Sequence, residues 1–167
     1  MSQTAPEPMT LSESVHVAAP PEAVWALVTD VGRTGEWSSV CTACEWDDPA
    51  VVADGPVVGA TFTGHNTSGE RSWDTTCTVT AADAPREFRW EVNGGLVRWG
   101  YVLTPEGDGT TLREDWEFTT AGQEFFHDKY AEHAPRVIAQ RAEEARTGVP
   151  ETLATLKRLA EASVAAP

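Results

Sequence analysis

The sequence predicts an α+β domain in which an antiparallel sheet of about seven strands packs against one long C-terminal helix. Near the C-terminus, apolar side chains recur at intervals of three or four residues, which is the spacing of one helix face. The preceding segments alternate apolar and polar residues between turn signals, as in an antiparallel meander. Alternate positions of these strands carry aromatic side chains, so one face of the sheet is apolar and needs a cover.

The first strand is predicted over residues 11–17, where the odd-numbered positions share one face. Pro20 and Pro21 end this strand, because proline cannot continue a strand ladder but suits the first turn of a helix. A short amphipathic helix is expected next. A second short helix, capped by Asp30 or Thr34, should follow it.

The remaining strands are separated by turn signals. They are predicted over residues 40–46, 60–66, 72–80, 87–92, 96–103 and 110–119. Asn93-Gly94 is a strong two-residue hairpin signal. Residues 122–133, which contain Phe125, Phe126 and Tyr130, should form a helical turn or a flap before the long helix.

The C-terminal helix is predicted from Pro135 to Val164. Its apolar stripe consists of Ile138, Ala142, Ala145, Val149, Leu153, Leu156 and Ala160. Pro150 has no N–H to donate and its ring crowds the preceding turn, so the helix should kink or break near Gly148. The stripe keeps its phase across the proline. We therefore expect one kinked helix or two helices nearly in line.

Strand parity predicts which side chains face this helix. The set of candidate ligand-binding residues on that face is Asn66, Trp73, Cys77, Trp90, Trp99, Tyr101 and Trp116. Large rings hold a sheet and a helix apart, whereas small aliphatic side chains let them pack flat, so a cavity is expected between the two layers. Phe126 and His127 are expected at its mouth.

Composition bounds the class of protein. The chain has 167 residues, 41% of them hydrophobic and 23% charged, which is ordinary for a globular domain. We expect a single domain over residues 10–164 after a disordered head over residues 1–9, with no apolar run that would direct the chain to a membrane, and hence a cytoplasmic location. The net charge of −14 repels phosphate backbones and anionic headgroups, so neither nucleic acid nor a membrane is an expected partner.

The cysteines do not form a recognisable redox or metal motif. Cys41 and Cys44 are spaced C-x-x-C, but residues three apart on a strand point to opposite faces. We interpret them as small buried side chains rather than as a redox or zinc pair. Glu124 and His127 form a Glu-x-x-His without the second copy that a di-iron bundle needs. No metal or cofactor is expected.

Glu114 is the candidate for acid–base chemistry. It shares its strand parity with Leu112, Trp116 and Phe118, so its side chain should point into the cavity. A carboxyl group in an apolar cavity has a raised pKa and can act as a general acid or base near neutral pH. The alternative is a structural role, in which Glu114 hydrogen-bonds a backbone N–H, Tyr101 or a tryptophan N–H.

Asn66 also has two interpretations. Its side-chain amide lies on the predicted cavity face, where it could orient a ligand carbonyl. It also directly precedes Thr67-Ser68-Gly69, so it could instead end the hairpin as a turn residue.

Several segments resemble the polyketide cyclase/dehydrase-like proteins of the START-like (SRPBCC) superfamily. They are residues 14–30 with Glu36-Trp37-Ser38, residues 58–66, the strand around Trp73, residues 109–114 and residues 152–157. The resemblance implies a helix-grip fold, in which a curved antiparallel sheet wraps around the C-terminal helix with a deep apolar cavity between them. The superfamily includes cyclases, lipid carriers and hormone receptors, so the resemblance alone does not give the function.

Three functional hypotheses follow. The first is a protein that binds an apolar small molecule, aromatic or polyketide-like, in the cavity. The second is a cyclase or dehydratase that uses the same cavity, with Glu114 as the general acid–base group and no metal or nucleotide cofactor. The third is a regulatory module whose cavity is incidental.

Overall fold

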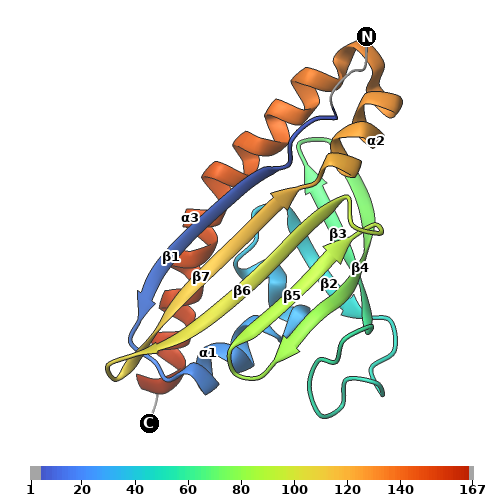
Figure 1. Cartoon of the computed structure of the whole chain (residues 1–167). Helices are drawn as coiled ribbons and strands as arrows, with labels where there is room; N and C mark the ends of the chain where they lie inside the picture. The colour runs from blue at the N-terminus through green and yellow to red at the C-terminus, as the bar shows by residue number, and fades with distance from the viewer. Residues whose placement is uncertain (1–4, 166–167) are drawn as a thin grey trace.

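The computed structural model describes residues 5–165 and has the expected α+β helix-grip architecture. One antiparallel sheet of seven strands, in the order β1-β7-β6-β5-β4-β3-β2, curves around a long C-terminal helix (Figure 1). The strands are β1 (Met9–Val17), β2 (Cys41–Trp46), β3 (Thr61–Ser68), β4 (Arg71–Asp83), β5 (Glu87–Val92), β6 (Val97–Glu106) and β7 (Gly109–Phe118). The helices are α1 (Pro21–Val28), the 3-10 helix η1 (Val31–Glu36), α2 (Thr120–Tyr130), the 3-10 helix η2 (Ala131–His133) and α3 (Ala134–Ala165).

The hairpin turns lie at glycines that adopt a left-handed backbone. Ser68 pairs with Arg71, so Gly69 (φ 61°) and Glu70 form the turn between β3 and β4. The β5–β6 turn begins at Asn93 (φ 48°), where the Asn-Gly signal predicted it, but Val92 pairs with Val97, so the turn has four residues rather than two. These positions favour glycine or asparagine because a Cβ is strained there.

The C-terminal helix is one continuous element through Pro150, so of the two predicted forms the single helix is correct. Every residue of the predicted apolar stripe is buried, whereas Pro150 is exposed. The missing N–H of Pro150 therefore lies on the solvent side, where water can serve the freed carbonyl. α3 runs along the sheet beside β1 and β7 (Figure 1).

Pro20 precedes the first turn of α1 as expected. Two side-chain hydrogen bonds hold α3 and α2 in place. The Thr152 hydroxyl of α3 donates to the Trp37 carbonyl at 3.0 Å, which ties α3 to the segment after η1. At the other end, the Thr119 hydroxyl caps α2 by accepting from the Gly122 N–H at 3.0 Å.

The predicted N-terminal head is described only in part. Residues 1–4 lie outside the described residues. Residues 5–8 lead into β1, and two of their carbonyl groups are hydrogen-bonded to α2. The Pro6 carbonyl accepts from Thr120 and the Glu7 carbonyl from Gln123, each at 2.7 Å.

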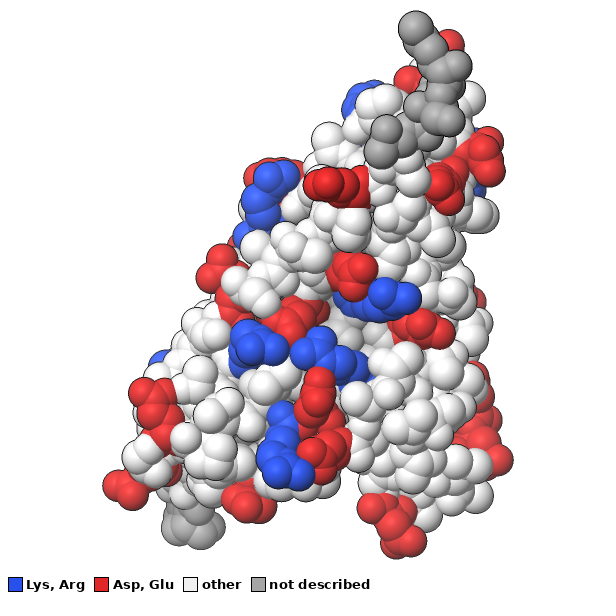
Figure 2. Space-filling model, in the orientation of Figure 1, with Lys and Arg blue, Asp and Glu red and all other residues white. Residues whose placement is uncertain are grey.

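The outer face of the sheet is charged. Figure 2 shows acidic groups spread over this face of the molecule, with basic groups gathered over the middle of the sheet. Arg89 and Arg113 each contact Asp115 at 2.9 Å, and Arg98 lies 3.5 Å from Glu117. Alternate positions of the same strands therefore divide into a solvated ionic face and an apolar inner face. Of the helices in residues 5–165, none has the length and hydropathy of a membrane span.

Candidate ligand cavity

A cavity of about 480 Å³ lies between the inner face of the sheet and the helices. Strands β2 to β7 line it on one side, and α2 and α3 line it on the other. Eight of the nine predicted ligand-binding residues are in its wall: Asn66, Trp73, Cys77, Trp90, Trp99, Tyr101, Trp116 and Phe126. Seven of them lie on strands β3 to β7, where regular alternation brings them to the inner face of the sheet, and Phe126 lies on α2.

The ninth predicted residue, His127, lies outside the cavity. It is exposed on α2, and the lining residues of that helix are Phe125, Phe126, Lys129 and Tyr130. The prediction treated residues 122–133 as one mouth segment. In a helix each residue turns about 100° from the last, so His127 faces away from the side that Phe126 and Tyr130 share.

Five of the seven tryptophans line the cavity, and Trp90 is at the centre of their aromatic wall. The Trp90 and Trp99 rings are stacked, with 6.4 Å between centroids and 14° between planes. Tyr101 and Phe88 contact Trp90 with centroid distances of 5.6 and 5.3 Å. A wall of this kind offers a flat, apolar surface to a ring-containing ligand.

Glu114 lies on β7 in this wall and is 4% exposed. Its Oε2 atom is buried and has no hydrogen-bond partner among residues 5–165. Burial raises the pKa of Glu114 to about 8, and Tyr101, its cross-strand neighbour, only partly opposes this shift. The carboxyl group is therefore mostly protonated at neutral pH. Its Oε2 atom lies in the cavity wall without a hydrogen-bond partner among the described residues.

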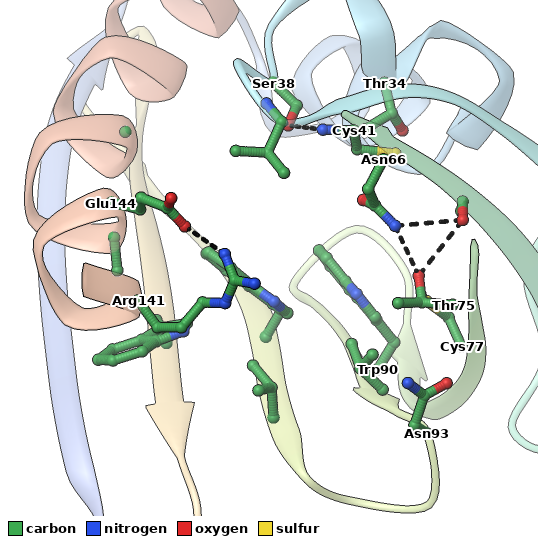
Figure 3. Close-up of a pocket in the computed structure, with 18 of the residues that line it drawn as sticks. Thr34, Ser38, Cys41, Asn66, Thr75, Cys77, Trp90, Asn93, Arg141 and Glu144 are labelled. Carbon is green, nitrogen blue, oxygen red and sulfur yellow. Dashed lines mark hydrogen bonds and ion pairs between the residues drawn. The ribbon is translucent and has the colours of Figure 1, made fainter. Parts of the chain in front are cut away.

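Asn66 belongs to strand β3 and lines the cavity, so of its two interpretations the turn residue is wrong. It pairs with Trp73 across the ladder, two residues before β3 ends. Its Nδ2 lies 3.2 Å from both the Gly64 carbonyl and the Thr75 hydroxyl, and 3.3 Å from the Trp73 carbonyl. Figure 3 shows the hydrogen bond between Asn66 and Thr75, with Cys41 next to Asn66. The amide oxygen is not engaged by these bonds and is available to a ligand donor.

Arg141 and Glu144 on α3 form a charged pair that the sequence pattern did not single out. Their side chains lie 2.9 Å apart and both line the cavity (Figure 3). The Arg141 guanidinium also lies 5.2 Å from the Trp73 ring centre, and Arg71 lies 4.3 Å from the same ring. Arg141 directly precedes buried Ala142, so it lies at the edge of the apolar stripe. This position is the one feature of the sequence that indicates a side chain directed toward the sheet.

The prediction that Cys41 and Cys44 face opposite sides of the sheet is wrong. A register shift between Cys41 and Ala43 leaves Thr42 as an extra residue, so Cys41 pairs with Asn66 and Cys44 with Gly64. Both side chains therefore point into the cavity, and their sulfur atoms lie 3.1 Å apart. Within residues 5–165, no group of three or more His, Cys, Asp or Glu side chains has a metal-binding arrangement.

Comparison with known proteins agrees with the fold. Residues 8–161 match the model of the family described as polyketide cyclase/dehydrase and lipid transport. No curated protein matches the chain. The solution structure of the polyketide cyclase-like protein Cgl2372 from Corynebacterium glutamicum is 46% identical, covers 95% of each chain and has a TM-score of 0.71.

More distant structures share the fold alone. The AHSA1-like protein from Aeromonas hydrophila is 24% identical, covers 93% of this chain and 94% of its own, and has a TM-score of 0.61. The di-domain ARO/CYC StfQ from the steffimycin biosynthetic pathway is 12% identical, with a TM-score of 0.68. That similarity covers 96% of this chain and 53% of StfQ.

Proposed function

Because the chain belongs to the polyketide cyclase/dehydrase and lipid transport family, we propose that it binds an apolar, ring-containing small molecule in the cavity between the sheet and α3. The volume of about 480 Å³ is within the range of roughly 300–1,000 Å³ that is usual for small-molecule sites. The lining combines a large aromatic surface with a few polar groups, which is the usual composition of such sites.

The observation that carries this proposal is the unpaired oxygen of Glu114. A buried polar atom without a partner costs about 1–3 kcal/mol, and a ligand that supplies the partner recovers that free energy. With its pKa raised to about 8, the carboxyl group is mostly protonated at pH 7 and can donate to a ligand carbonyl. The expected ligand therefore has fused or linked rings and an oxygen acceptor that reaches Glu114.

Two relatives are consistent with this class of ligand. Cgl2372 is named as polyketide cyclase-like, and StfQ is named as an ARO/CYC of a biosynthetic pathway. We infer that the ligand of the present chain is a polyketide-like, ring-containing compound.

Native mass spectrometry of freshly purified protein tests the binding function first. We expect an additional apolar molecule to accompany the protein in stoichiometric amount. If the cavity is empty, flavone is a suitable probe, since it has aromatic rings and a ketone acceptor. We then expect saturable quenching of tryptophan fluorescence at one flavone per chain, because five tryptophans line the cavity. No accompanying molecule and no saturable quenching across a panel of aromatic ketones would favour the regulatory module.

The second candidate function is catalysis in the same cavity, as a cyclase or dehydratase. It is favoured by the position of Glu114, whose raised pKa near neutrality suits a general acid–base group. The aromatic wall would hold a poly-carbonyl chain in a folded conformation while Glu114 moves a proton. Glu114→Gln should then abolish turnover and leave ligand affinity within a few-fold. Equal turnover in this variant would exclude Glu114 from the reaction.

A further inference from the structure

We propose that Cys41 and Cys44 form a redox site, in which a hydroperoxide that enters the cavity oxidises the two thiols to a disulfide. The two sulfur atoms lie 3.1 Å apart, so the bond of about 2.0 Å requires the sulfurs to approach by about 1 Å. Both residues line the cavity, and Cys41 is also partly exposed. This inference concerns the thiols alone and does not depend on the ligand proposed above.

Two features of the sheet produce this pair. The extra residue Thr42 rotates the strand so that Cys41 and Cys44 share a face, and the Thr42 hydroxyl is fixed by donating to the His65 carbonyl at 3.0 Å. Gly64 lies beneath both sulfurs. A Cβ built at Gly64 would be 3.7 Å from each sulfur, which is an ordinary contact, and 2.9 Å from the Thr75 hydroxyl, so Gly64 packs against both sulfurs and leaves room for Thr75.

The two thiols are suited to different steps. The contact with Cys41 lowers the pKa of Cys44 to about 7, against the opposing effect of burial. The same contact and burial raise the pKa of Cys41. Cys44 is therefore partly thiolate at neutral pH and is the nucleophile, whereas Cys41 remains a thiol next to it.

The reaction balances with one hydroperoxide. The Cys44 thiolate attacks the terminal oxygen and the O–O bond breaks, so that Cys44 becomes a sulfenic acid and the leaving alkoxide takes from solvent the proton that Cys44 had released, giving the alcohol. Cys41 then attacks the Cys44 sulfur, the S–S bond forms, and the S–O bond breaks to release water with the proton of Cys41. Two thiols and one hydroperoxide give one disulfide, one alcohol and one water.

The third cysteine gives an internal control. Cys77 lies on β4 in the same cavity wall, and its sulfur is 3.9 Å from the Thr75 hydroxyl. Burial raises the pKa of Cys77 to about 12, which makes it a poor first nucleophile, and among residues 5–165 its sulfur contacts the Thr75 hydroxyl rather than either of the other two sulfurs, so it is not placed to form the disulfide. The proposal therefore assigns the disulfide to Cys41 and Cys44 and leaves Cys77 reduced.

The test treats the reduced, folded protein with tert-butyl hydroperoxide at pH 7 and follows intact mass and peptide masses. We expect the wild type and Cys77→Ser to lose about 2 Da through a Cys41–Cys44 bond. Cys41→Ser should instead gain about 16 Da as the Cys44 sulfenic acid, which a dimedone trap captures, and Cys44→Ser should stay unchanged. The native wild type should react at least about tenfold faster than the protein unfolded in urea, because the fold brings the two thiols together.

Wild-type peptide mapping keeps the test decisive even if a serine variant fails to fold. A disulfide that includes Cys77, an unchanged wild-type mass, or equal rates in the folded and unfolded protein would each overturn the proposal.

Discussion

Tyr101 and Glu114 lie directly opposite each other on β6 and β7, and both are buried in the cavity wall at 3% and 4% exposure. Burial raises the pKa of each group, and the Glu114 charge raises the pKa of Tyr101 further. Both side chains are therefore stable in the folded protein only in their neutral forms near pH 7. This relationship makes the stability of the protein sensitive to pH.

Glu114→Gln should reduce the loss of unfolding free energy that the wild type shows as the pH rises. The folded pKa of about 8 lies above the ordinary value of 4.5, so the proton stabilises the fold fully below pH 4.5 and progressively less up to about pH 8. Between pH 5 and pH 9 the wild type should lose up to about 4 kcal/mol of unfolding free energy more than the variant. Urea denaturation at the two pH values measures this difference.

Glu117→Gln is the matched control for that measurement. Glu117 is on the same strand but belongs to the outer face, where it lies 3.5 Å from Arg98. An exposed pair of this kind contributes little to stability, so the control should follow the wild-type pH profile. If Glu114→Gln also follows that profile, Glu114 is ionised in the folded protein and the donor role proposed for it is wrong.

Trp90→Leu should weaken the binding of flavone by at least about tenfold, because the central ring of the aromatic wall is lost. Trp46→Leu is the control, since Trp46 packs on Phe62 with a centroid distance of 5.3 Å but does not line the cavity. Calorimetric titration measures both affinities without relying on tryptophan fluorescence. Equal losses in the two variants would place the binding site elsewhere or assign the effect to general destabilisation.

The parts of this structure that the sequence predicted depend on regular periodicity. The stripe from Ile138 to Ala160 repeats at helical spacing, and the strand that carries Trp90 alternates, so both faces follow from the chain itself. Three predictions are wrong: the faces of Cys41 and Cys44, the turn interpretation of Asn66 and the position of His127. In each case the tertiary structure departs from the local sequence pattern. The bulge at Thr42 depends on how β2 pairs with β3, and a one-residue shift reverses the faces that parity predicts.

The other two errors have the same origin. Asn66 resembles a turn residue locally, but β3 continues beyond it because the glycine turn lies at Gly69. His127 is next to Phe126 in the sequence, and the two residues point in different directions only because α2 extends from Thr120 to Tyr130. The charged pair on α3 was missed because a polar residue beside an apolar stripe is normally solvated, and only the cavity makes it face inward.

Arg141 and Glu144 should set the affinity for an acidic ligand in opposite directions. The Arg141 guanidinium lines the cavity, so Arg141→Gln should weaken the binding of 2-naphthoate more than that of flavone. Glu144→Gln removes the carboxylate that Arg141 contacts and should strengthen the binding of 2-naphthoate. Arg136→Gln, an exposed change on the same helix, should alter neither affinity. The same titration compares the two ligands, and an unchanged affinity ratio in Arg141→Gln would contradict this role.

Gly122→Ala and Gly148→Ala should have opposite effects on stability, although both add one methyl group to a helix. A Cβ at Gly122 would collide with the Leu96 carbonyl oxygen, so α2 must move away from the β5–β6 turn at a cost of about 1–3 kcal/mol. The nearest atom to a Cβ at Gly148 is the Ser39 hydroxyl at 3.6 Å, so alanine fits and should add up to about 1 kcal/mol through its helix propensity. Urea denaturation measures both changes. A stable Gly122→Ala variant would mean that α2 is not held against the β5–β6 turn.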